Sequence, residues 1–184
     1  MTDIEEAKME RIMTWKEIDS RFLPNWYDKA KFGIFIHWGL SSVPAFAPLR
    51  EEIGGSGATY SEWYGYHLKR GFRPYVEFHE KNFKGLNYEN FADLWKAELF
   101  NADEWAKLFA ESGAKYLCLV SKHHDGFCLF DSSYSKSWNS LCMGPKRDIT
   151  EELLTACEKR GIHRGVYYSL LEWEHPISGD HGAV

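Results

Sequence analysis

Two adjacent histidines and an aspartate directly follow an apolar run in this chain of 184 residues. The apolar run extends from Tyr116 to Val120 and reads as a buried strand. The polar residues that end it are Ser121-Lys122-His123-His124-Asp125-Gly126-Phe127. Side chains of these types can bind a metal, act as an acid–base pair, form hydrogen bonds with a substrate, or simply end a strand.

A metal site is the least favoured of these alternatives. Neighbouring side chains in a strand point to opposite faces, so His123 and His124 would face one ion only if the strand broke there. The H-x-H spacing that would avoid this problem is absent, and none of the 4 cysteines belongs to a C-x-x-C motif. We therefore expect no metal and no cofactor, and neither a zinc site nor a disulfide framework.

Carbohydrate chemistry fits the sequence better than nucleophilic catalysis by a triad. There is no G-x-S-x-G motif, and no cysteine has an obvious histidine partner. Neutral imidazoles both donate and accept hydrogen bonds, so they can bind sugar hydroxyls. Aromatic residues make up 16% of the chain, including 8 Trp, and flat rings pack well against the apolar face of a sugar. Most of these rings are nevertheless expected in the core.

Two further positions could contribute to such a site. His37 follows the apolar run Phe32 to Ile36, and Glu62 stands beside the ring of Trp63. Each also has a structural interpretation, with His37 as a satisfied buried histidine, Glu62 as a solvated loop charge and Trp63 as part of the core. The residues alone leave both interpretations open.

Strands and helices alternate along the chain in a way that would bring these residues together. Strands are predicted at 32–36, 116–120 and 165–169. Helices are predicted from Asn101 to Gly113 and from Asp148 to Gly161, and a shorter helix is predicted after Thr14. Thr14-Trp15-Lys16-Glu17 and Asp148-Ile149-Thr150-Glu151 both have the form of a capping box. Residues 40–86 show no clear period and are predicted to form a long irregular connection.

This alternation predicts an α/β fold with parallel strands that are apolar on both faces. The chemically interesting residues follow the carboxyl ends of the strands, where α/β barrels and open parallel sheets bind ligands. No glycine-rich nucleotide-binding motif follows a strand, which favours the barrel. Since a whole (β/α)8 barrel takes about 250 residues, we expect residues 1–184 to be the amino-terminal portion, about three β/α units, of one incomplete TIM-type barrel domain without a second domain.

The charge and hydropathy of the chain disfavour several other classes of protein. The net charge of −5 argues against a surface for nucleic acid or anionic membranes. No apolar run approaches the ~20 residues that span a bilayer. The first residues are polar and acidic, unlike a signal peptide, so a cytoplasmic location is expected.

Several motifs resemble those of the α-L-fucosidase family (glycoside hydrolase family 29), and they occur in the family's order between about residues 14 and 176. The most specific are Phe32-Gly33-Ile34-Phe35-Ile36-His37-Trp38-Gly39 and Lys122-His123-His124-Asp125-Gly126-Phe127. The others are Ser42-Val43-Pro44-Ala45, Glu62-Trp63, Gly113-Ala114-Lys115-Tyr116, Trp138-Asn139-Ser140, Gly144-Pro145-Lys146-Arg147-Asp148, and the segment from Gly165 to Trp173.

The resemblance implies a retaining exo-glycosidase that removes terminal α-L-fucose from glycans or glycoconjugates, in a family whose members are often lysosomal or secreted. The residues that match the family's fucose-pocket motifs are His37, Glu62, Trp63, His123, His124 and Tyr167. By this resemblance Trp63 forms an aromatic wall, while the histidines and Tyr167 bind ring hydroxyls. Asp125 is expected to shape the turn with Gly126 rather than to act in catalysis.

The resemblance also has a gap at the catalytic carboxyl groups. Retaining glycosidases use two carboxyl groups about 5 Å apart, a nucleophile and an acid/base. The family's nucleophilic Asp and acid/base Glu would both fall beyond Val184, so no catalytic residue is assigned here. We expect an amino-terminal part of an α-L-fucosidase that is inactive alone, the alternatives being a non-catalytic fucose-binding remnant or an inactive fragment.

Overall fold

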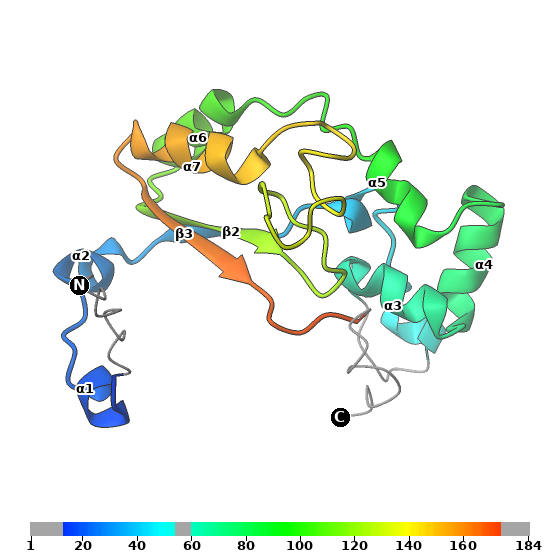
Figure 1. Ribbon diagram of the computed structural model, residues 1–184, viewed down its shortest axis with the longest axis horizontal. Coiled ribbons are helices and arrows are strands. Elements are labelled where there is room, and N and C mark those ends of the chain that lie inside the picture. Colours follow the sequence, from blue (N-terminus) through cyan, green and yellow to red (C-terminus); the bar gives the residue numbers. More distant parts are fainter. Residues whose placement is uncertain (1–12, 54–59, 174–184) are drawn as a thin grey trace, which may run out of the picture. The chain divides into compact units, whose positions relative to one another are not determined.

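The computed structural model describes residues 13–53 and 60–173 (Figure 1). The chain divides into two compact units, residues 1–31 and 32–184. In the first unit, the described residues form α1 (Trp15–Asp19) and α2 (Asn25–Ala30). The predicted capping box at Thr14 is confirmed, because Thr14 Oγ1 accepts from the Glu17 amide and the Glu17 carboxylate accepts from the Thr14 amide.

The second unit is built on a three-stranded parallel sheet. Its strands are β1 (Gly33–Ile36), β2 (Tyr116–Lys122) and β3 (His163–Tyr168), in the order β1-β2-β3. Ile36 pairs with Leu119, and Val120 pairs with Tyr167, so the three strands end at nearly the same level. The predicted parallel and adjacent strands are confirmed.

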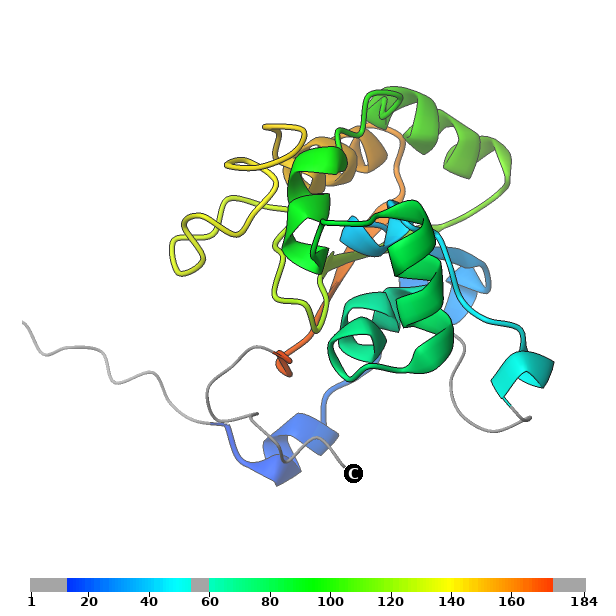
Figure 2. The same ribbon diagram turned by 90° about the vertical axis from the view of Figure 1, so that its right-hand side faces the viewer.

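Two helices connect these strands and pack on one face of the sheet. They are α6 (Ala102–Glu111), between β1 and β2, and α7 (Ile149–Glu158), between β2 and β3 (Figures 1 and 2). Asn101 caps α6, as predicted, by accepting bonds from the amides of Asp103 and Glu104.

Only half of the capping box predicted for α7 is present. Asp148 Oδ1 accepts from the Glu151 amide at 2.8 Å. The Glu151 carboxylate instead accepts from the Thr155 hydroxyl at 3.1 Å. Since residues four apart lie on the same face of a helix, the Thr155 hydroxyl is within reach of the Glu151 side chain and engages it.

The core lies between the sheet and the helices of this unit. Its fully buried apolar side chains include Leu117 and Leu119 of β2 and Leu153 of α7. Each is at most 1% exposed, so these side chains fix the sheet against α7. The large aromatic and aliphatic members of the cluster are Leu40, Tyr64, Tyr75, Phe91, Trp95, Phe100, Phe109, Phe127, Leu129, Ile149 and Ile162.

The segment predicted to be irregular is mostly helical. It contains η1 (Leu40–Ser42), η2 (Arg50–Ile53), η3 (Ser61–Trp63), α3 (Tyr64–Lys69) and α4 (Arg73–Asn82), followed by η4 (Tyr88–Asn90) and α5 (Phe91–Leu94). The prediction of an irregular segment is wrong. Helix α4 buries only Tyr75 and His79, at i and i+4, so its sequence lacks the repeated apolar positions that would have indicated a helix. Aromatic packing and the bond between Tyr64 Oη and His79 Nδ1, at 2.9 Å, stabilise these short helices.

The expectation that all strands are covered on both faces is wrong for β3. Val166 and Tyr168 are each 49% exposed, and on the face away from α7 Phe35 is 61% exposed. The ring of Tyr167 lies 6.0 Å from that of Phe35. Helices α6 and α7 lie on one face of the sheet, whereas Phe35 and Tyr167 on the other face are exposed.

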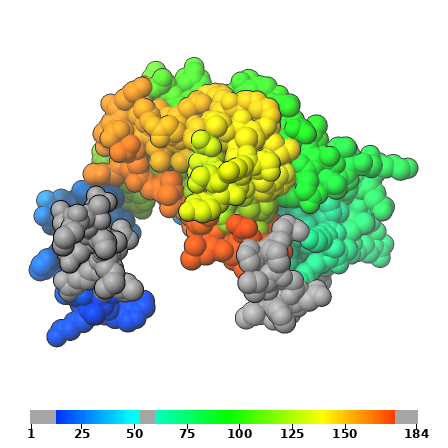
Figure 3. Space-filling model, viewed as in Figure 1, coloured from blue at the N-terminus to red at the C-terminus, as the bar shows by residue number. Residues whose placement is uncertain are grey.

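The connection from β2 to α7 is held to the helical layer at Gly144. This glycine has a φ of +60°, and a Cβ atom built on it would lie 2.4 Å from the carbonyl oxygen of Trp95 and 2.7 Å from that of Ala92. Real Cβ atoms do not approach backbone that closely, so only glycine fits. The contact fixes the segment 129–147, which forms a continuous surface beside the end of β3 (Figure 3).

Replacement of Gly144 by Ala should therefore destabilise the protein severely, by more than about 3 kcal/mol, since positive φ and backbone overlap add. Gly161→Ala is the matched control, because Gly161 has a φ of +69° with no atom within 4 Å of its Cβ position. Urea unfolding should show a loss of only about 1 kcal/mol for this control. Equal losses in the two variants would contradict the close approach at Gly144.

Candidate functional site

Three of the six residues singled out by sequence lie at the carboxyl ends of the parallel strands. His37 follows β1, His123 follows β2, and Tyr167 is near the end of β3. The ring centroids of His37 and His123 are 4.3 Å apart, and those of His123 and Tyr167 are 6.3 Å apart. The shared level of the strand ends produces this cluster.

The two adjacent histidines lie on the same side of the chain. β2 ends at Lys122, and a turn follows in which the Gly126 amide donates to the carbonyl oxygen of His123. The rings of His123 and His124 are therefore only 4.1 Å apart. The condition named in the sequence analysis is met, because β2 and its strand alternation stop at Lys122. Among residues 13–53 and 60–173, no group of three or more His, Cys, Asp or Glu side chains is arranged to hold a metal ion.

Glu62 and Trp63 join the cluster from the short helix η3. Glu62 Oε1 lies 3.8 Å from His37 Nδ1, with both side chains less than a third exposed. The ring of Trp63 is 5.6 Å from that of His124 and 5.4 Å from that of Trp173. Glu62 is thus more than a solvated loop charge, and all six residues are connected by contacts.

Burial keeps the central imidazoles neutral at ordinary pH. Desolvation, followed by the nearby His37, His124 and Lys122, lowers the pKa of His123 to about 3. Desolvation also lowers the pKa of His37, and although Glu62 opposes this effect, the net shift stays downward. A neutral imidazole has one donor and one acceptor, which suits it to a ligand that carries hydroxyl groups.

Asp125 is held by hydrogen bonds within the protein. Its Oδ2 accepts from the Tyr88 hydroxyl at 2.8 Å, and its Oδ1 accepts from the Phe127 amide at 3.1 Å. Its carbonyl oxygen accepts from the indole of Trp138 at 2.9 Å. Burial raises the pKa of Asp125 although these hydrogen bonds oppose the shift. The expectation that Asp125 shapes the turn with Gly126, whose φ is +73°, is confirmed.

Two cavities adjoin this cluster. A small one of about 20 Å³ lies among His37, Glu62 and His123. A much larger one of about 880 Å³ lies beyond the turn and is lined by Lys122, Tyr168, Glu172 and Trp173 among others. Asp125 lines both. The larger of these two cavities is therefore not the one beside His37 and His123, and we place the site at the histidines because their chemistry converges there.

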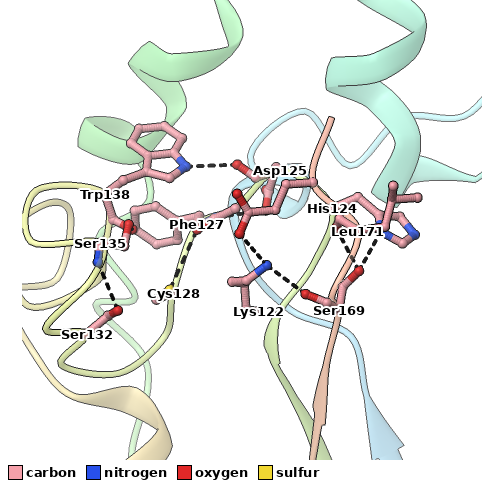
Figure 4. A network of polar contacts seen from close by, with 12 residues as sticks. Lys122, His124, Asp125, Phe127, Cys128, Ser132, Ser135, Trp138, Ser169 and Leu171 are labelled. Carbon is pink, nitrogen blue, oxygen red and sulfur yellow. Dashed lines mark hydrogen bonds and ion pairs between the residues drawn. The ribbon is translucent and has the colours of Figure 1, made fainter. Parts of the chain in front are cut away.

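Four residues near His124 were not among the candidates from the sequence. They are Lys122, Ser169, Glu172 and Trp173, and Figure 4 shows the polar contacts around Lys122, His124 and Ser169. Lys122 Nζ lies 2.7 Å from Glu172 Oε1, although Lys122 is only 2% exposed. The sequence signals that could have identified two of these residues are that Lys122 stands beside the paired histidines and that Glu172 follows the third strand. Their pairing, however, depends on the register of the sheet.

Comparison with known proteins identifies the family. The family model for α-L-fucosidase matches residues 2–181. Human plasma α-L-fucosidase is 47% identical over 167 residues, which cover 89% of this chain and 33% of the human protein. The chain therefore belongs to the α-L-fucosidase family of glycoside hydrolases, and it spans about a third of the length of the curated relatives it matches.

Solved structures agree with this assignment. The Thermotoga maritima α-fucosidase in complex with fucose is 44% identical with a TM-score of 0.80, covering 87% of this chain and 38% of that one. A trapped covalent intermediate of a Bacteroides thetaiotaomicron α-L-fucosidase is 31% identical with a TM-score of 0.61, covering 82% of this chain and 30% of that one. Within the described residues, no helix has the length and apolar character needed to cross a membrane.

The depressed pKa of His123 predicts how stability depends on pH. As the pH falls from 6.5 towards 3, the unfolded chain binds a proton at this residue while the folded protein does not, so the free energy of unfolding falls. The replacement His123→Gln should remove this contribution, which is at most about 1.4 kcal/mol per pH unit. Urea unfolding across this range would measure it, and equal slopes for both proteins would contradict the neutral, desolvated imidazole.

Proposed function

We propose that residues 1–184 are the amino-terminal part of the single (β/α)8 catalytic domain of an α-L-fucosidase, and that about three β/α units of the barrel lie here. The order β1-β2-β3 with parallel pairing and one-sided helices supports this proposal. The exposed Phe35 on the face of the sheet away from α7 supports it as well, because a closed barrel would bury that side chain. Further strands would then come from the remaining two thirds of a protein as long as its relatives.

The proposed activity is removal of terminal α-L-fucose from glycans or glycoconjugates. The observation that carries this proposal is the convergence of residues from three strand ends and one short helix. These residues are His37, Glu62, Trp63, His123, His124 and Tyr167. The bound fucose of the Thermotoga maritima relative agrees with a sugar in such a site.

Each of these residues has a role that suits its chemistry. The neutral His37 and His123 would exchange hydrogen bonds with ring hydroxyls, as would His124 and the Tyr167 hydroxyl. Trp63 would offer a flat wall to the apolar face of the sugar.

The catalytic carboxyl groups are proposed to lie outside these residues. Of the carboxylates near the cluster, Asp125 is engaged by Tyr88 and the turn, and Glu172 is paired with Lys122. Glu62 alone remains beside His37, and double displacement needs two carboxyl groups. The covalent intermediate of the Bacteroides thetaiotaomicron relative supports a retaining mechanism for the whole enzyme. The expected cytoplasmic location and lack of nucleic-acid binding stay predictions.

The full-length protein should hydrolyse an aryl α-L-fucoside with retention of configuration, while residues 1–184 alone should not. Binding groups without a nucleophile and an acid do not lower the barrier, and the acid alone is worth about 10²–10⁴-fold. A chromogenic assay of both proteins, with NMR of the first sugar product, measures this.

Turnover by residues 1–184 that persists after repurification and drops in Glu62→Gln would contradict the assignment of the catalytic groups. An inactive full-length protein that still binds L-fucose would instead indicate a non-catalytic binding protein. Lack of both activity and binding would indicate a non-functional chain.

Replacement of Trp63 by Ala should weaken binding of L-fucose to the full-length protein by about tenfold, since an aromatic contact is worth about 0.5–1.5 kcal/mol beyond its buried area. The variant Trp63→Phe should recover most of the affinity. Trp15→Ala is a matched control, because Trp15 is 80% exposed on α1. Calorimetric titration measures the three affinities, and an unchanged value for Trp63→Ala would remove this residue from the site.

A further inference from the structure

The residues that follow β3 turn back and support His124 from behind. The Ser169 amide donates to the carbonyl oxygen of Lys122 at 3.1 Å, and the Trp173 amide donates to that of His124 at 2.8 Å. Residues 169–173 are therefore tied at both ends to the chain that carries His124. This arrangement brings the Ser169 side chain against the imidazole (Figure 4).

The Lys122 ammonium holds this short segment in place. Lys122 is 2% exposed, and its Nζ donates to the Ser169 carbonyl oxygen at 2.7 Å and lies 2.7 Å from Glu172 Oε1. The same Nζ lies 4.6 Å from the centre of the Tyr168 ring. A buried charge is tolerated only with partners of this kind, so the ammonium favours one conformation of residues 169–172.

The hydrogen bonds among His124, Ser169 and Leu171 indicate which nitrogen of His124 carries a proton. Three atoms lie within reach of one another, with His124 Nδ1 2.6 Å from Ser169 Oγ and 3.2 Å from the Leu171 carbonyl oxygen. Ser169 Oγ lies 2.8 Å from the same carbonyl oxygen. The carbonyl only accepts, and the hydroxyl has one hydrogen to give.

Only one arrangement satisfies both short contacts. If Ser169 donated to Nδ1, that nitrogen would have no hydrogen to offer, and the Leu171 carbonyl oxygen would receive none from either Nδ1 or the hydroxyl. If Nδ1 carries the hydrogen, it donates to Ser169 Oγ, and the hydroxyl donates to Leu171. Ser169 is 3% exposed, so its hydroxyl depends on these two groups for its hydrogen bonds.

We propose that Ser169 is a positioning residue that fixes His124 with a proton on Nδ1, so that Nε2 is the ring nitrogen left to form a hydrogen bond with a hydroxyl of the bound sugar. Nε2 forms no hydrogen bond with any residue in the ranges 13–53 and 60–173. The His124 ring contacts the rings of His123, Trp63 and Trp173, which lie in the proposed sugar site. The ligand class rests on the proposed function, whereas the tautomer does not.

The full-length protein with ¹⁵N-labelled histidine tests the tautomer directly. Long-range ¹H–¹⁵N correlation spectra should show a proton on Nδ1 of His124, and none on Nε2, in the wild type. In Ser169→Ala this preference should be lost, and Ser169→Thr should restore it because the hydroxyl is kept. Ser121→Ala is the matched control, since Ser121 is also 3% exposed and its hydroxyl donates to the Tyr167 carbonyl oxygen at 3.0 Å.

Affinity for L-fucose tests the consequence. Ser169→Ala should bind L-fucose about 3- to 10-fold more weakly than the wild type, the effect of one hydrogen bond, while Ser169→Thr stays near the wild type. A proton on Nε2 in the wild type, or the same tautomer and affinity in Ser169→Ala, would overturn the proposal. If the wild type shows the Nδ1 proton but binds no L-fucose, the positioning role stands and the proposed function fails.

Discussion

Parallel pairing of β1, β2 and β3 is the constraint on which the site depends. Parallel strands carry evenly spaced hydrogen bonds, and their carboxyl ends meet at one edge of the sheet. Because Val120 pairs with Tyr167 and Ile36 pairs with Leu119, His37 and Tyr167 stand at nearly the same level on either side of β2. The register of the strands therefore positions the central residues of the site, and the connecting segments supply further side chains such as Glu62 and Trp63.

The site depends equally on the removal of water from its imidazoles. Aromatic side chains surround the histidines, and desolvation is the first cause of the lowered pKa of both His37 and His123. A charged imidazole is only a donor, whereas a neutral one can also accept. Burial therefore allows these residues both to donate hydrogen bonds to hydroxyl groups and to accept them. The ring of Trp63, which contacts that of His124, comes from the short helix η3 rather than from the sheet.

Buried charges on the other side of the same turn have a structural function. Lys122 links the ends of β2 and β3 through the Ser169 carbonyl oxygen and Glu172, and Asp125 links the turn to Tyr88. Such groups are costly to bury and are costlier still when unpaired, so each holds its partners in one arrangement. Lys122 and Asp125, two residues of one short motif, thus support the histidines between them.

The sequence alone determined the class of fold, the positions of the strands, and the family, because apolar runs, caps and specific motifs are local features. It also named His37 and His123 through their places at strand ends, and Tyr167 through its match to the family's motifs. Only the tertiary structure decided that His123 and His124 share one side, because that depends on where β2 stops pairing. The helices at 64–82 escaped prediction because their stability comes from aromatic packing between segments rather than from a local period. Likewise, the contact between Ser169 and His124 joins residues 45 apart, and only the register of β2 against β3 brings them together.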